Sequence, residues 1–263
     1  MLGALIGDIV GSRFEWDNYK GKNFELFTKE CRPTDDSLMT LALGAAICSA
    51  KEDYSDLSEK AVHYMQVMGR RYPDAGYGER FMTWLLLENP KPYGSYGNGS
   101  AMRVSGAGFA GKSLEEVRLI ARKVTEVTHN HPEGMKGAEA TAVAIYLARI
   151  GETIPEIRKY IEDHYYKMES SIDEIRKTYE YDVSCQGSVP QALLCFFEST
   201  SFEDAIRNAI SLGGDSDTIG AICGGVAEAY YGIPEDIREK ALTYLDDYQK
   251  KLLFDFENKY ERP

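Results

Sequence analysis

The chain has 263 residues, 43% of them hydrophobic, and a formal net charge of −12. This length and composition fit a globular protein with one large core. The acidic excess argues against a nucleic-acid partner, because phosphate backbones are bound by clustered Lys and Arg. No apolar run is long enough to span a membrane, and the first residues lack the basic start of a signal peptide. Five cysteines without a CxxC pair are typical of reduced thiols, so we expect a cytoplasmic protein.

Apolar residues recur at helical spacing along most of the chain. A first helix is expected almost at the N-terminus, and the spacing predicts further helices over Leu38–Ala50, Ala61–Gly69, Arg80–Leu87, Leu114–Val127, Glu133–Arg149, Phe202–Leu212 and Thr218–Tyr231. Another is expected to start at the capping box of Thr153 and Glu156, and a long one to run from Pro234 to about Glu257. Alternating strands and a βαβ pattern are absent. The sequence predicts a single all-α domain over residues 1–263 with about ten helices.

Two clusters of oxygen-bearing side chains stand where predicted helices begin, at Thr34–Asp36 and at Asp215–Thr218. Such residues also serve as ordinary helix caps, which is the alternative interpretation. A cap needs one residue, however, and each cluster offers three. Adjacent carboxylates repel one another unless a cation compensates them. If folding brings the clusters together, they form an all-oxygen cage of the kind that Mg²⁺, Mn²⁺ or Ca²⁺ prefers.

Two other patterns match known motifs, for dinucleotide binding and for phosphatases, but lack the structural context that these motifs require. The segment Gly106–Gly111 matches GxGxxG, but no strand precedes it, as a dinucleotide fold would require. The DxD of Asp215 and Asp217 would serve a phosphatase only at the end of a buried strand, and the preceding residues do not predict one. Glycines gather in three groups, around positions 3–11, 94–108 and 213–225. In a helical protein they indicate close backbone approach or loops around a ligand.

Five blocks of the sequence, in order, resemble the ADP-ribosylglycohydrolase family. They are Gly3–Glu15, Thr34–Asp36, Gly97–Arg103, Thr128–Pro132 and Gly213–Thr218. Each block alone is moderately specific, and five in the same order make chance agreement improbable. The resemblance implies an all-α fold, which agrees with the helical periodicity.

The resemblance also implies a centre of two Mg²⁺ or Mn²⁺ ions. By position, one ion would be held by Thr34, Asp35 and Asp36, the other by Asp215 and Thr218, with Asp217 between them. Glu15 matches an acid that can transfer a proton, although without the resemblance it is equally well a solvated loop residue. Asp36, as a metal-bound aspartate, is the alternative catalytic base. Asp8 is expected to be structural or to support the metal ligands from behind, with an ordinary acid of an N-terminal helix as the alternative.

The substrate-binding residues implied by the resemblance are Gly97, Asn98, Gly99, Ser100, Met102 and His129. Backbone N–H groups of the Gly97–Ser100 loop would face a diphosphate, as in other anion nests; the alternative is a plain Asn-Gly turn. His129 has an alternative role at a helix terminus. Arg103 is left between phosphate binding and pairing with an acid. Trp16 offers a stacking surface for a ligand, with a place in the core as the alternative.

The function implied is a metal-dependent hydrolase that cleaves the anomeric N- or O-glycosidic bond of an ADP-ribosyl group on a protein or small molecule. The leaving group stays open among arginine, serine, O-acetyl and other adducts. A catalytically silent ADP-ribose-binding relative and a Mg²⁺-dependent phosphoesterase are the alternatives. The segment between His129 and Gly213 is expected to line the substrate entrance with its tyrosines, Tyr165, Tyr166, Tyr179 and Tyr181. Nothing in the sequence predicts the oligomeric state.

Overall fold

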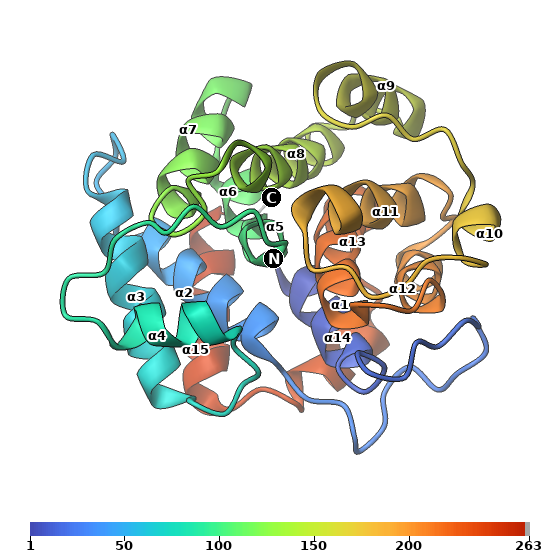
Figure 1. Cartoon of the computed structure of the whole chain (residues 1–263), viewed down its shortest axis with the longest axis horizontal. Coiled ribbons are helices and arrows are strands. Elements are labelled where there is room, and N and C mark those ends of the chain that lie inside the picture. The colour runs from blue at the N-terminus through green and yellow to red at the C-terminus, as the bar shows by residue number, and fades with distance from the viewer. Residues whose placement is uncertain (261–263) are drawn as a thin grey trace.

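A computed structural model describes residues 1–260, which form fifteen helices and no sheet (Figure 1). In chain order the helices are α1 (Leu2–Gly11), α2 (Asp35–Ser49), α3 (Leu57–Arg71), α4 (Glu79–Leu86), α5 (Gly99–Met102), α6 (Ser105–Ala110), α7 (Leu114–Thr125), α8 (Pro132–Arg149), α9 (Ile154–His164), α10 (Ile172–Ile175), α11 (Cys185–Phe197), α12 (Phe202–Ser211), α13 (Ser216–Tyr231), α14 (Glu235–Leu242) and α15 (Asp247–Tyr260). The prediction of one all-α domain is confirmed. Within residues 1–260 no helix combines the length and apolarity needed to cross a membrane.

Four helices form the buried centre of the molecule. Every residue of α1 is buried, and α2, α8 and α13 are buried along most of their lengths. The helix α1 lies beside α13 in Figure 1, although the two come from opposite ends of the sequence. Amphipathic helices such as α3, α7 and α12 cover this centre and turn their charged faces outward.

Glycines let α1 and α13 touch backbone to backbone. A Cβ atom on Gly7 would lie 1.9 Å from the carbonyl oxygen of Gly220, and one on Gly3 would lie 2.3 Å from that of Gly224. Any side chain at these positions would therefore force the helices apart. At the end of α1, a Cβ on Gly11 would lie 2.5 Å from the Cα of Asp217. The crossing thus fixes the carboxyl end of α1 against the first turn of α13. Of the two roles expected for glycines, these ones serve close helix packing.

The prediction of one long helix after Pro234 is wrong. The segment forms α14 and α15, separated by a turn at residues 243–246. Asp246 starts α15 with a reciprocal cap, because its N–H donates to Gln249 Oε1 and its Oδ1 accepts from the N–H of Gln249. This D-x-x-Q pattern is a capping box that the apolar spacing concealed. The predicted box at Thr153 and Glu156 is present.

The predicted total of about ten helices is also too low. The additional helices α5, α6 and α10 have four to six residues, which is too short for a periodic apolar pattern. The longer α11 escaped prediction because Gly187 and Pro190 interrupt its pattern. Gly187 lies in the first turn, and Pro190 lies inside the helix. Ser184 caps α11 by accepting from the N–H of Gly187 at 3.1 Å.

Candidate functional site

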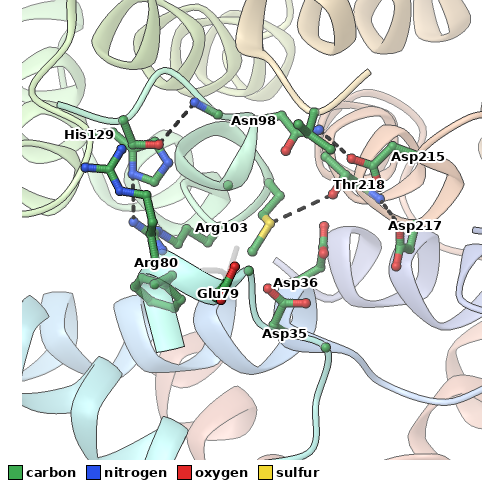
Figure 2. Close-up of a pocket in the computed structure, with 18 of the residues that line it drawn as sticks. Asp35, Asp36, Glu79, Arg80, Asn98, Arg103, His129, Asp215, Asp217 and Thr218 are labelled. Carbon is green, nitrogen blue, oxygen red and sulfur yellow. Dashed lines mark hydrogen bonds between the residues drawn. The ribbon is translucent and has the colours of Figure 1, made fainter. Parts of the chain in front are cut away.

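A cavity of about 440 Å³ opens where the N-terminal ends of α2, α4 and α13 meet the turn after α1 and the loops before α5 and α11. Most of the residues predicted for the site line it: Glu15, Asp35, Asp36, Gly97, Asn98, Gly99, Met102, His129, Asp215, Asp217 and Thr218. Thr34 and Ser100 are buried but are not part of the cavity wall. The two acidic clusters, far apart in the sequence, therefore face one space (Figure 2).

The first cluster combines a helix cap with an uncompensated acid. The Thr34 hydroxyl accepts from the N–H of Asp36 at 3.3 Å and donates to Asp8 at 2.6 Å, so Thr34 does cap α2. Asp36 is buried, and its Oδ1 has no hydrogen-bond partner among the described residues. Burial raises the pKa of Asp36 well above its usual value, and the charges of Asp8 and Asp35 raise it further. Capping thus accounts for Thr34 but leaves Oδ1 of Asp36 without a hydrogen-bond partner in the described residues.

Asp8 proves to be a member of the site. It is the one charged residue in α1 and is completely buried. Its carboxylate accepts from the N–H and the hydroxyl of Thr34 and from the N–H of Ser37, at 2.6–3.0 Å. These bonds confirm the structural role predicted for Asp8, since they tie α1 to the start of α2. Asp8 does not line the cavity, but its carboxylate lies in one group with those of Asp36 and Asp217. An acid inside an otherwise apolar helix was the signal in the sequence for such a role.

The second cluster begins α13 after a tight glycine turn. Gly213 and Gly214 have φ values of +67° and +66°, a region that other residues rarely adopt. Asp215 Oδ2 accepts from the side-chain amide of Asn98 at 2.6 Å, which joins this turn to the loop before α5. The pKa of Asp217 is raised well above its usual value, first by burial and then by the charges of Asp36 and Asp215.

Two groups of carboxylates share Asp217. One ligand oxygen each from Asp8, Asp36 and Asp217 lie within 4.8 Å of one another, and so do oxygens of Glu15, Asp215 and Asp217. No Lys or Arg of residues 1–260 forms an ion pair with any of these five acids. Buried carboxylates without a cation are unfavourable, so this all-oxygen set fits hard divalent ions. Asp35 lines the cavity but belongs to neither group.

Glu15 and Asp35 are acids whose protonation is shifted toward neutral pH. Glu15 stands half-buried on the turn after α1. Burial and the charges of Asp215 and Asp8 raise its pKa, against the opposing effects of Arg32 and a hydrogen bond from Tyr181. Burial, followed by the charges of Asp8 and Asp215, raises the pKa of Asp35 to about 7. A carboxylate with a raised pKa is suited to accepting a proton from a reacting group.

The other side of the cavity carries a buried cation and a neutral imidazole. Figure 2 shows Arg103 and His129 across from the acids of α13. Arg103 is 1% exposed, stacks over Phe81 and donates to the hydroxyl of Thr128 at 2.7 Å. Burial lowers its pKa to about 10, so it remains charged at neutral pH. Arg103 makes no ion pair within the described part of the chain, and its Nε has no hydrogen-bond partner there. It therefore does not pair with an acid, which was one of the two roles considered for it.

The hydrogen bonds around His129 indicate which of its two ring nitrogens carries the hydrogen. Its Nδ1 contacts the Thr128 hydroxyl at 2.7 Å and the Arg103 guanidinium at 3.4 Å. Because a guanidinium only donates, Nδ1 accepts and Nε2 carries the hydrogen. Burial and the charge of Arg103 lower the pKa of His129 well below its usual value, so the ring is neutral. Its Nε2 is the side-chain atom nearest to Gly99, at 3.6 Å from a Cβ built there.

In the loop expected to hold a diphosphate, some of the N–H groups already donate hydrogen bonds within the protein. The N–H of Asn98 donates to the carbonyl of Val183 at 2.7 Å, and that of Gly97 to the hydroxyl of Ser95 at 3.2 Å. Gly99 and Ser100 begin α5, where N–H groups have no intrahelical acceptor. The Ser100 hydroxyl donates to the carbonyl of Gly134 at 2.8 Å, away from the cavity wall.

Aromatic and basic residues complete the wall. Of the four tyrosines expected at the entrance, Tyr181 lines the cavity and the other three do not. Sequence reasoning missed Arg80, whose guanidinium lies 4.8 Å from the centre of the Tyr93 ring. Both residues line the cavity, but neither stands in a recognisable motif. Arg80 stands in the first turn of α4, whereas Tyr93 stands on the loop between α4 and α5, whose path no local pattern specifies.

A model of the ADP-ribosylglycohydrolase family matches residues 1–261 of the chain. Human ADP-ribosylhydrolase ARH3 is 29% identical over 93% of this chain and 88% of its own length. ADP-ribosylarginine hydrolase Tri1 of Pseudomonas putida is also 29% identical, over 89% of this chain and 70% of its own. A solved structure described as an ADP-ribosylglycohydrolase-related protein complex superposes with a TM-score of 0.70 at 22% identity, covering 98% of this chain and 95% of that one.

Proposed function

The chain belongs to the ADP-ribosylglycohydrolase family, and we propose that it is a metal-dependent hydrolase that cleaves the anomeric N- or O-glycosidic bond of an ADP-ribosyl group. The adduct would be an ADP-ribosylated protein or an ADP-ribosyl small molecule. The observation that carries this proposal is the pair of carboxylate groups sharing Asp217, which face a buried arginine across one cavity. An ADP-ribosyl group has two parts to be bound: the ribose, which metal ions held by carboxylates can bind, and the diphosphate, which an arginine can bind.

The carboxylates would hold two Mg²⁺ or Mn²⁺ ions. Asp8, Asp36 and Asp217 form one candidate ligand set, and Glu15, Asp215 and Asp217 the other. Asp35 and Thr218 line the same space and complete the ligands that the family resemblance implies. When bound, such ions supply Lewis acidity and fix the ribose hydroxyls. Oδ1 of Asp36 is a buried carboxylate oxygen without a hydrogen-bond partner in the described residues, and a cation would satisfy it.

Protein groups at the acidic end would handle the proton of the attacking water. Glu15 is half-buried, beside Asp215 and Asp217, and its raised pKa suits it as the base. Asp36 is the alternative base. The water oxygen forms a bond to the anomeric carbon as the bond to the leaving nitrogen or oxygen breaks, and the leaving group takes a proton. Positive charge that develops at the anomeric carbon in such a reaction would be favoured by the surrounding carboxylates.

Arg103 and His129 would receive the diphosphate. Arg103 is a buried cation without an ion pair in the described residues, and the Nε2–H of His129 faces the start of α5. Together with the N–H groups of Gly99 and Ser100, these donors offer an anion site in a protein of net charge −12. Met102 lies between this site and the acids, where its thioether contacts the hydroxyl of Thr218 at 3.9 Å. The cavity is thereby divided into a phosphate end and a ribose end.

Product analysis tests the proposal. The protein is incubated with an ADP-ribosylated peptide and Mg²⁺ or Mn²⁺, and the products are separated by chromatography and identified by mass. Free ADP-ribose and an unmodified peptide are expected, and a chelator should abolish their formation. AMP or ribose phosphate would instead indicate a phosphoesterase, and an unchanged substrate a silent relative. The exposed Glu88→Gln variant serves as the matched control and should retain full activity.

A further inference from the structure

Trp16 occupies an unusual position for a tryptophan. Its side chain is 79% exposed, whereas Trp84, the second tryptophan of the chain, is 2% exposed. Phe14, two residues earlier, is buried and packs on the rings of Tyr19 and Phe24. The turn after α1 therefore buries one aromatic ring and exposes another. The exposure shows that the core role considered for Trp16 is wrong. An exposed indole gains none of the stabilisation that burial would give, so its position suggests a role in binding.

The exposed indole has one aromatic neighbour, Tyr181. Their ring centres are 5.1 Å apart with an interplanar angle of 23°, which is a stacked arrangement. Tyr181 lines the cavity and Trp16 does not. The pair thus continues the cavity wall outward as an aromatic surface, and that surface starts beside Glu15, the neighbour of Trp16 in the sequence.

Both rings of the pair are flanked by acids. The sequence reads Glu15-Trp16-Asp17 on one segment and Glu180-Tyr181-Asp182 on the other. Lys20, on the same turn as Trp16, is occupied, because its ammonium donates to the carbonyls of Tyr179 and Leu212 at 2.5 Å each. In space, the carboxylates of Asp215, Glu15 and Asp217 are close enough to raise the pKa of Tyr181, after burial. An aromatic face beside such carboxylates attracts cations, through the ring quadrupole and through the negative charge.

The surface lies on the leaving-group side of the reaction. In the proposed function the diphosphate end is formed by Arg103 and His129, and the ribose lies at the carboxylates. Tyr181 and Glu15 adjoin Asp215 and Asp217 rather than Arg103. A group attached to the anomeric carbon therefore leaves past Glu15 and meets the Trp16–Tyr181 pair.

We propose that the Trp16–Tyr181 pair binds the leaving group and selects a guanidinium, so that the substrate is ADP-ribose linked to arginine. This inference rests on the proposed function and names its substrate class. A guanidinium is planar and weakly hydrated, so it stacks on aromatic faces better than an ammonium does. A serine hydroxyl has no charge and gains nothing comparable from the pair. The surface thus favours arginine-linked over serine-linked ADP-ribose.

The kinetic test compares two peptides that carry the same ADP-ribosyl group, one on arginine and one on serine. Trp16→Ala should lower kcat/KM for the arginine-linked peptide by about 3- to 30-fold, from the size of cation–π interactions, and change the serine-linked value less than twofold. Trp16→Phe keeps a π face and should retain most activity, whereas Trp16→Leu keeps only apolar surface and should resemble Trp16→Ala. Phe254→Ala removes an exposed ring from α15 and is the matched control.

Equal losses on both peptides would overturn the inference, since they would make Trp16 a support for Glu15. Faster cleavage of the serine-linked peptide by the unaltered protein would overturn it as well. A binding measurement separates its failure from failure of the proposed function. In the Glu15→Gln background, the arginine-linked peptide should bind more tightly than free ADP-ribose, and Trp16→Ala should remove that difference. Tighter binding that depends on Trp16 supports the inference even in a protein without turnover, and no dependence on Trp16 refutes it.

Discussion

The site combines two kinds of backbone. Asp8, Asp36 and Asp217 stand on the buried helices α1, α2 and α13. Glycine contacts that leave no room for a side chain set the spacing of α1 and α13. Glu15 and Tyr181 stand on turns at the surface of the molecule and are only partly buried. Groups that share a cation need fixed distances, which packed helices provide. Groups that meet water or a leaving group need access, which turns provide.

The largest effect is expected from the turn. Glu15→Gln keeps the shape of the side chain but removes a base, so turnover should fall by about two to four orders of magnitude. ADP-ribose affinity should change far less, because Arg103, His129 and the helix-borne acids remain. Steady-state kinetics and calorimetric titration with ADP-ribose measure the two effects separately.

Glu79→Gln is the control for this change, because Glu79 lines the cavity but belongs to neither carboxylate group. It should keep turnover within about tenfold of the unaltered protein, below the range expected of a lost base. Near-normal turnover in Glu15→Gln would exclude the proton-transfer role. Equal losses of affinity and turnover would indicate that Glu15, like the acids on the helices, acts mainly as a metal ligand.

The next effect concerns the helix crossing. Gly7→Ala places a methyl group 1.9 Å from the carbonyl oxygen of Gly220, so the free energy of unfolding should fall by about 3 kcal/mol or more. Gly78→Ala is the control, because a Cβ there meets nothing within 4 Å, and it should change stability by less than about 0.5 kcal/mol. Denaturant unfolding measures both. A Gly7→Ala variant as stable as the control would show that the crossing does not set the site.

The difference between helices and turns also explains which parts of the site could be predicted from the sequence. Clusters such as Thr34–Asp36 and Asp215–Thr218 were visible because acids and hydroxyls gather at predicted helix starts. The all-α fold was visible in the apolar spacing, but the break between α14 and α15 was not, since it depends on the side chain of Gln249. An acid in an apolar helix marked Asp8 as unusual, but its place beside Asp217 could not be predicted. That place follows from the α1–α13 crossing, which brings together residues more than 200 positions apart.

Tyr181 and Arg80 were the least predictable residues of the cavity wall. Tyr181 was named only as one of four tyrosines, and Arg80, in the first turn of α4, was not named as a site residue at all. Their places follow from long-range contacts, such as the hydrogen bond from Asn98 to Val183 that positions the segment after Tyr181. Glu15 was found through the family resemblance, because nothing in the turn itself requires an acid.

A smaller effect tests the repulsion among the helix-borne acids. Asp217→Asn removes a buried carboxylate that lies among others and whose pKa is raised by burial and by Asp36. Without metal at neutral pH, this variant should melt a few degrees higher than the unaltered protein, because one uncompensated charge is gone. With Mn²⁺ the order should reverse, since only the intact site gains stability from the ion. A metal-free melting temperature that falls on substitution would contradict the repulsion.

The smallest effect is expected behind the cavity wall. Ser100→Ala removes the hydrogen bond to the carbonyl of Gly134 and should cost about 1 kcal/mol of stability. ADP-ribose affinity should stay within about twofold if the residue contributes only its backbone N–H. Thermal unfolding and calorimetry measure the two quantities. A large loss of affinity with unchanged stability would assign the hydroxyl to the substrate.

The most direct measurement is a calorimetric titration of the metal-free protein with Mn²⁺. Two ions per chain are expected to bind, and Asp217→Ala should remove most of the affinity because it belongs to both carboxylate groups. Asp35→Ala should lose less, since Asp35 lies outside those groups. Unchanged Mn²⁺ binding in Asp217→Ala, or no binding to the unaltered protein, would contradict a metal centre held between α1, α2 and α13.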